Sequence, residues 1–185
     1  MDAAQQRFTS LYDTRYRDIL AYFMRRLDST PAAQDLTEDV FVIAWRKLDQ
    51  VPEEPEAAYW LYGVARRTLA NYRRTMERRH RLTPTLRPAA QSRLEDPTDQ
   101  LVRNDEARAV HDAISTLRTS DQELIRLAYW DELPHKVIGD LVGCSRSAVD
   151  VRLHRAVRRL RKALAHSGHF PIAELPLGTP KEASW

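Results

Sequence analysis

Residues 120–164, SDQELIRLAYWDELPHKVIGDLVGCSRSAVDVRLHRAVRRLRKAL, contain two apolar repeats of helical spacing that a glycine turn separates. The first repeat is short and consists of Val137, Ile138 and Leu141. Gly143 follows it, and glycine accepts the positive φ that a tight turn requires. A second helix is predicted from Ser145 onward. The order of short helix, turn and long helix predicts a helix-turn-helix unit, which places its second helix in a DNA major groove.

The predicted second helix is strongly basic. Its apolar residues recur at steps of three and four and form one face: Val149, Leu153, Val157, Leu160 and Leu164. Seven cations fill other positions against the single anion Asp150: Arg146, Arg152, Arg155, Arg158, Arg159, Arg161 and Lys162. A solvated helix face is the alternative explanation of such a charge run. The preceding turn favours DNA binding, because it presents the helix so that some side chains contact base edges and others phosphates.

Local signals predict where three helices begin. Ser120 has Glu123 three residues later, the pattern of a capping box at a helix N-terminus. Pro134 suits the first position of the short helix, where no backbone N–H is needed. Nearer the N-terminus, Thr30 is predicted to cap a helix that has Pro31 at its first position.

The composition predicts an all-α protein. The chain has 185 residues, 5 glycines and 30% charged residues, without the β-branched alternation typical of sheets. Its single cysteine, Cys144, cannot form an internal disulfide. The N-terminus lacks the basic start and apolar core of a signal peptide, and no apolar run reaches the roughly 20 residues of a membrane span. We expect a cytoplasmic protein with no direct membrane insertion.

Three prolines divide the chain into two small helical domains. Pro84, Pro88 and Pro97 lie in a segment that has no sustained apolar period. We therefore predict a flexible linker between the domains and a flexible C-terminal tail, with boundaries at 1–81, 82–101, 102–165 and 166–185. The first domain is predicted to hold three or four helices, the first three covering residues 8–27, residues 30–48 and a segment from Glu56 onward.

Charges in the first domain are sorted by sign. Residues 28–56 hold eight acids against Arg46 and Lys47, which should repel DNA and suit a basic protein partner. Residues 66–81 hold seven arginines against one glutamate. The two blocks therefore predict different partners.

Aromatic residues are interleaved with the arginines of the predicted third helix. They are Tyr59, Trp60, Tyr62 and Tyr72. Bases stack on such rings while guanidinium groups hold the phosphate backbone, so the pattern is typical of single-stranded DNA binding. Core packing is the alternative for some of these rings. We predict that Trp60 faces the core, because it shares its apolar spacing with later core positions, and that Tyr59 is more accessible.

Three segments in this order resemble a known family. They are DLTEDVFVIAW at residues 35–45, YWLYGVARRTLANYRR at residues 59–74 and RLHRAVRRLRKAL at residues 152–164. In order and spacing they are similar to bacterial RNA polymerase sigma factors of the sigma-70 family, in the extracytoplasmic-function (ECF) group.

This resemblance implies a sigma-2-like helical bundle and a sigma-4-like helix-turn-helix domain in a subunit that binds core RNA polymerase and directs it to promoters. It implies contacts to the clamp of the largest polymerase subunit from Asp35, Glu38, Asp39 and Val42. The loop at 49–57 would capture a flipped base of the minus-ten element. Minus-ten DNA would also contact Tyr59, Arg66, Arg67, Asn71, Tyr72 and Arg74. Minus-thirty-five DNA would contact Arg146, Ser147, Asp150, Val151, Arg152 and Arg155. An anti-sigma factor is the expected regulatory partner.

The sequence leaves one alternative function open, a free-standing helix-turn-helix regulator whose first domain senses a signal or dimerises. No phosphate loop, carboxylate pair or Ser/His/Asp arrangement is present, so we expect no enzyme activity and no cofactor. His166 and His169 lack the further ligands that a zinc site needs, and no metal is expected.

Overall fold

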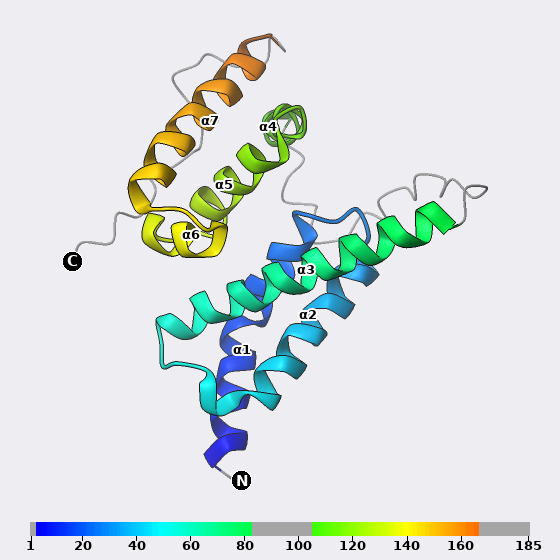
Figure 1. The fold of residues 1–185 in the computed structure, drawn as a ribbon, viewed down its shortest axis with the longest axis vertical. Coiled ribbons are helices and arrows are strands. Elements are labelled where there is room, and N and C mark those ends of the chain that lie inside the picture. Colours follow the sequence, from blue (N-terminus) through cyan, green and yellow to red (C-terminus); the bar gives the residue numbers. More distant parts are fainter. Residues whose placement is uncertain (1–2, 83–104, 167–185) are drawn as a thin grey trace. The chain divides into compact units, whose positions relative to one another are not determined.

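The computed structural model describes residues 3–82 and 105–166, and the regular elements in these ranges are all helical (Figure 1). The chain forms two compact units, Met1–Leu94 and Glu95–Trp185. The predicted all-α fold with two small helical domains is confirmed. The predicted linker and tail fall almost entirely outside the described residues, so their boundaries stay predictions. Within the described ranges, no helix combines the length and apolar character needed to cross a membrane.

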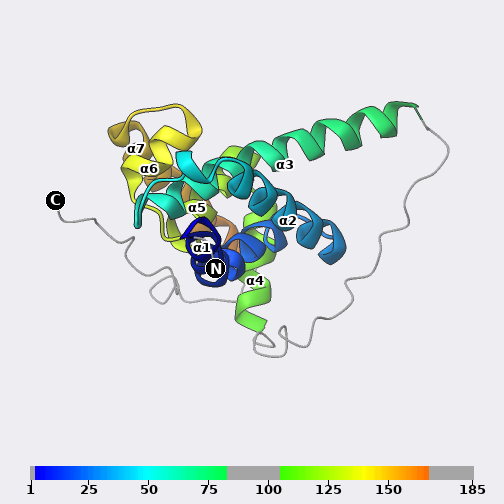
Figure 2. The ribbon, with the colours of Figure 1, turned by 90° about the horizontal axis from the view of Figure 1, so that it is seen from below.

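The first unit is a three-helix bundle with one helix that extends beyond it. Its elements are α1 (Ala3–Met24), α2 (Thr30–Arg46), the short 3-10 helix η1 (Leu48–Gln50) and α3 (Glu56–Leu82). α1 packs against α2, and α3 packs against both. The C-terminal part of α3 projects past α1 and α2, as Figures 1 and 2 both show. All its side chains from Arg73 to Arg81 are exposed.

The core of the first unit lies between the three helices. Its most buried large side chains are Ile19, Tyr22, Phe23, Val40 and Leu61. The Tyr22 ring meets Phe23 edge-on at 5.3 Å and Tyr62 at 5.7 Å between centroids. The buried Arg26 guanidinium lies 3.6 Å from the centroid of the Tyr22 ring. Aromatic and cation–π contacts therefore supplement the apolar packing.

Ser29, not Thr30, caps α2. The Ser29 backbone is extended, and its hydroxyl oxygen accepts a hydrogen bond from the Ala32 N–H at 3.3 Å. Thr30 is already the first helical residue, so Pro31 lies second in the helix. The prediction was wrong by one residue because two adjacent hydroxyl residues can each cap, and the backbone conformation selects between them.

The second unit packs three helices against one long helix. α4 (Asp105–Ser115), α5 (Thr119–Tyr129) and α6 (His135–Val142) each contact α7 (Arg146–His166). Its core includes Leu124, Ile125, Leu127, Ile138, Val149, Leu153, Ala156, Leu160 and Leu164. The predicted apolar face of α7 is confirmed except at Val157, which is only half-buried. Ala156 takes its place in the core.

The turn between α6 and α7 has the predicted form. Gly143 has a φ of 75°, in the left-handed region that glycine accepts at little cost. The Cys144 N–H donates to the Gly139 carbonyl at 2.9 Å, and Ser145 accepts from the Ala148 N–H at 3.2 Å. The Ser145 hydroxyl thus caps the start of α7.

The predicted capping box at Ser120 is absent, because α5 begins at Thr119 and the cap position lies two residues before Ser120. The extended residue before the helix is Arg118, which makes no side-chain cap hydrogen bond, so Ser120 is already helical. Pro134 is likewise extended and precedes α6 instead of occupying its first position.

Candidate functional site

The acidic residues of α2 lie on its solvent-facing side. Asp35, Glu38, Asp39 and Val42 are all exposed, and their spacing of three and four residues places them on one helix face. Trp45 extends this face and is 48% exposed. We call these five residues the α2 face. It combines three carboxylates with two exposed apolar side chains.

Half-buried rings of α1 border the α2 face. Phe8 meets Trp45 edge-on at 5.0 Å, and Tyr12 lies 4.9 Å from both Tyr16 and Phe41 between ring centroids. Burial raises the pKa of Tyr12, with smaller contributions from Tyr16 and Glu38. This aromatic border was not predicted from sequence, because it forms only when α1 and α2 pack together.

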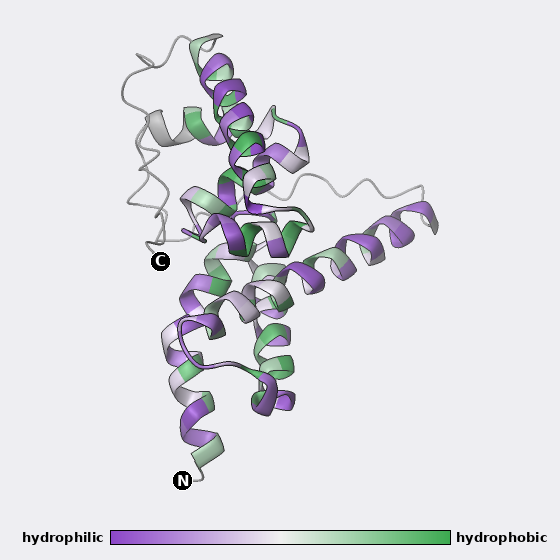
Figure 3. Ribbon diagram, turned by 60° about the vertical axis from the view of Figure 1, so that its left-hand side comes forward, coloured by the Kyte–Doolittle hydropathy of each residue, from purple (hydrophilic) through white to green (hydrophobic). Residues whose placement is uncertain are grey.

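The exposed side of α3 gathers most of the predicted minus-ten residues. Tyr59 and Arg66 are seven residues apart, about two helical turns, and so are Arg67 and Arg74, so each pair shares one side of the helix. All four except the half-buried Tyr59 are exposed. Asn71 is exposed at the edge of this side, where its side-chain oxygen accepts a hydrogen bond from Arg74. Figure 3 shows the hydrophilic character of the projecting end of α3. These five residues form the α3 face.

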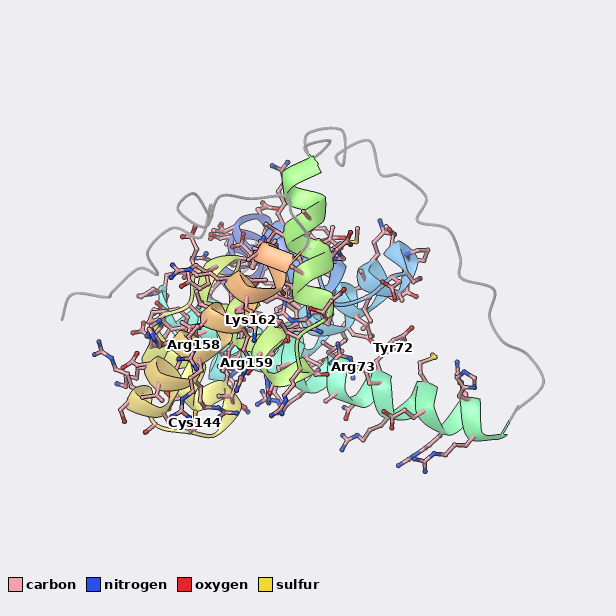
Figure 4. The ribbon with its side chains drawn as sticks, turned by 90° about the horizontal axis from the view of Figure 1, so that it is seen from above. Tyr72, Arg73, Cys144, Arg158, Arg159 and Lys162 are labelled. Carbon is pink, nitrogen blue, oxygen red and sulfur yellow. The ribbon has the colours of Figure 1, made fainter. Side chains whose placement is uncertain are left out.

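Tyr72 does not share the α3 face. It follows Arg67 by five residues, which is about 140° around the helix, and it is half-buried. Its neighbour Arg73, labelled beside it in Figure 4, is exposed. The Arg73 guanidinium donates to the Arg26 carbonyl at 3.4 Å.

The expected contrast between Trp60 and Tyr59 is absent. Both are half-buried, and the core positions of this turn are Leu61 and Tyr62. Trp60 precedes Arg67 by seven residues, two helical turns, so it lies on the same side as that arginine. The sequence prediction for Trp60 was wrong because the buried positions of α3 fall in the pairs Ala57–Ala58 and Leu61–Tyr62, which leaves Trp60 between them at the edge of the core.

The loop between η1 and α3 is held by two arginines of α1. The Arg7 guanidinium donates to the carbonyls of Leu48 at 2.7 Å and Pro52 at 3.3 Å, and to that of Val51. The Arg15 guanidinium donates two hydrogen bonds to the Glu54 carboxylate, of 2.9 and 2.7 Å. These bonds raise the pKa of Arg15. Neither arginine was predicted from the sequence, because both contacts join residues about forty positions apart.

The predicted minus-thirty-five residues lie on the first three turns of α7. Arg146, Ser147, Asp150, Val151, Arg152 and Arg155 are all exposed. Ser147, Val151 and Arg155 follow at steps of four, and exposed Arg158 and Lys162 continue this line along α7 (Figure 4). We call this line the α7 face.

Three neighbouring polar residues make contacts within the second unit. The Asp150 carboxylate contacts Nδ1 of His135 at the start of α6. Arg152 approaches the sulfur of Cys144 at 3.7 Å. Arg159 binds Asp121 of α5 at 2.7 Å, and that carboxylate is buried. The Arg159–Asp121 ion pair therefore links α7 to α5.

Two family models match the two units. Sigma-70 region 2 matches residues 11–79, and sigma-70, region 4 matches residues 107–160. The chain belongs to the sigma-70 family. Several related proteins carry the ECF name, which places this sigma factor in the ECF group.

Individual relatives of this sigma factor match most of its length. It is 29% identical to the RNA polymerase sigma factor YlaC of Bacillus subtilis, covering 85% of this chain and 91% of that protein. It is 25% identical to the ECF sigma factor SigK of Mycolicibacterium vanbaalenii, covering 85% and 81%. A crystal structure of RpoE with the anti-sigma factor NepR from Bartonella quintana has a similar fold. Its TM-score is 0.60 at 20% identity, and the match covers 85% of this chain and 96% of RpoE.

The comparisons confirm the family resemblance of the sequence and favour the sigma factor over the free-standing regulator. Both units match regions of one family, in the order that the sequence predicted. The sigma factor is thus a transcription initiation factor.

Proposed function

We propose that this sigma factor binds core RNA polymerase through the α2 face and directs it to promoters through the α3 and α7 faces. The observation that carries the proposal is the separation of charge within the first unit. Exposed carboxylates gather on α2, whereas exposed arginines gather on α3. A single small domain with both surfaces is suited to bind a basic protein surface and nucleic acid at the same time.

The composition of the α2 face favours a protein partner. Its carboxylates would repel phosphate, while exposed Val42 and Trp45 provide apolar area that an interface can bury. The partner consistent with this chemistry is a basic, amphipathic surface, and the clamp of the largest polymerase subunit is the proposed one. Trp45 joins the predicted contact residues in this proposal.

The α3 and α7 faces favour different forms of DNA. On α3, half-buried Tyr59 and Trp60 stand beside exposed Arg66 and Arg67, which suits stacking of unpaired bases next to held phosphates. The α7 face follows a helix-turn-helix turn, which suits insertion into the major groove of a duplex. We therefore assign the minus-ten element to α3 and the minus-thirty-five element to α7. The sites of action would lie in the cytoplasm, with the polymerase and the chromosome.

An anti-sigma factor is the proposed regulatory partner. The related fold of RpoE was solved in complex with one, and the α2 face with its aromatic border offers a mixed apolar and acidic surface for such a protein.

A charge reversal on α2 tests the polymerase assignment. Asp35→Lys with Asp39→Lys should abolish capture by immobilised core polymerase, because opposite charges across an interface set complementarity. Unfolding should be unaffected, because exposed charges contribute little to stability. Asp13→Lys with Asp28→Lys is the matched control, since it changes two exposed acids outside α2. Undiminished capture of the α2 variant would contradict the assignment.

A further inference from the structure

The loop at 47–55 follows α2 and leads into α3, and it lies against α1, which precedes it by about forty residues. We propose that Arg7 and Arg15 are positioning residues that hold this loop in the shape in which it captures an unpaired promoter base. The inference rests on the proposed function of the loop in minus-ten recognition.

Arg7 fixes the first half of the loop through its backbone. One guanidinium donates to the carbonyls of Leu48, Val51 and Pro52 and lies 3.3 Å from the Glu53 carboxylate. A guanidinium presents five N–H donors in a rigid fork, so a single side chain can satisfy several acceptors at once. These contacts fix the direction of three peptide groups, which a lysine with its compact charge could not match.

Arg15 fixes the second half of the loop through a side chain. Its two hydrogen bonds to Glu54 have the bidentate geometry that makes arginine–carboxylate pairs specific. Arg7 and Arg15 are eight residues apart, which separates them by about 12 Å along α1. The two arginines therefore hold the loop at both ends.

Once its backbone is held against α1, the loop exposes only some of its groups to a ligand. The Val51 side chain is buried at 4% exposure and anchors the centre of the loop in the protein. The carbonyls that Arg7 binds face α1, whereas the side chains of Asp49 and Gln50 are exposed. A loop with its shape fixed before binding loses little conformational entropy when it captures a base. Base discrimination would then depend on arginines that do not themselves touch DNA.

The test uses the full-length sigma factor in holoenzyme with Arg7→Met and Arg15→Gln. Arg17→Gln is the control, because Arg17 is an exposed arginine of the same helix. Hydrogen exchange at residues 47–55 reports the loop, and open-complex formation on four templates that differ at the captured base reports discrimination. Asp49→Ala and Gln50→Ala, which change exposed loop side chains, test separately whether the loop reads the base at all.

We expect loop exchange to accelerate at least about tenfold in Arg7→Met, as for a locally opened segment. Discrimination among the four templates should fall at least about fivefold, the smaller end of what one base contact provides. Core capture and the behaviour of Arg17→Gln should match the parent. Unchanged loop exchange, or unchanged discrimination when Asp49→Ala or Gln50→Ala does alter it, would overturn the positioning role. Unchanged discrimination in the two loop variants would instead overturn the proposed function of the loop.

Discussion

Gly139→Ala tests whether close packing of α6 against the turn sets the position of α7. A Cβ added at Gly139 would lie 2.6 Å from the carbonyl oxygen of Cys144 and 3.4 Å from the carbonyl carbon of Ser145. Real Cβ atoms essentially never approach within 3.0 Å, and the obstructing atom belongs to the backbone. The turn that leads into α7 must therefore move in the variant.

The size of the effect follows from two opposing contributions. Overpacking a tight site costs about 1–3 kcal/mol, and the upper part of this range applies because backbone cannot rotate away as a side chain can. Replacing glycine by alanine inside a helix returns up to about 1 kcal/mol. We expect Gly139→Ala to destabilise the second unit by about 1–2 kcal/mol. The displaced α7 should also weaken holoenzyme binding to promoters that carry a minus-thirty-five element.

Gly143→Ala is the matched control in the same turn. A Cβ at Gly143 meets no atom within 4 Å, but its φ of 75° is strained for alanine. The strain costs about 1–2 kcal/mol without requiring α7 to move. Hydrogen exchange of α7 amides should therefore report similar destabilisation in both variants, while promoter binding by the folded holoenzyme falls only in Gly139→Ala. Parental stability and binding in Gly139→Ala would refute the packing argument, as would an equal loss of binding in both variants.

Three further variants separate folding from DNA contact. Phe23→Ala should lower the stability of the first unit by about 3–5 kcal/mol, because it removes a fully buried ring; a smaller shift in exchange of α1 and α2 amides would contradict this core assignment. Arg159→Ala should destabilise the second unit by about 1–3 kcal/mol, because it leaves the buried Asp121 carboxylate without its ion pair; parental exchange of α5 amides would show that the pair contributes nothing. Arg158→Ala should leave stability unchanged and lower the salt slope of promoter binding by about one, as expected for a phosphate contact. An unchanged slope would show that Arg158 does not contact a phosphate.

Much of the fold could be predicted from the sequence, because long amphipathic repeats record which helix faces are buried. The face formed by Val149, Leu153, Leu160 and Leu164 and the glycine turn are both present in the structure. Helix starts were less predictable. Ser29 and Thr30 are equally able to cap α2, and at α5 the extended backbone of Arg118 overrides the capping signal of Ser120.

The parts of the site that were missed depend on contacts between distant segments. Arg7 and Arg15 look like ordinary charged residues of an amphipathic helix until the loop folds against them. Arg159 resembles its neighbours in the basic run, yet Asp121 engages it from another helix. Trp45 fits the apolar repeat of α2, but its ring packs against the half-buried ring of Phe8 on one side, and the residue stays 48% exposed. Single-helix periodicity contains no information on these partners.

Binding of the purified chain to promoter DNA, with and without core polymerase, tests the central claim most directly. In a gel shift at near-physiological salt, the sigma factor alone should show little preference for promoter duplex, because one small module makes few base contacts and the other needs a melted strand. Addition of core polymerase should produce sequence-specific binding. Tight, specific binding by the isolated chain in the roughly nanomolar range of dedicated regulators, unaltered by core polymerase, would contradict the assignment and restore the free-standing regulator.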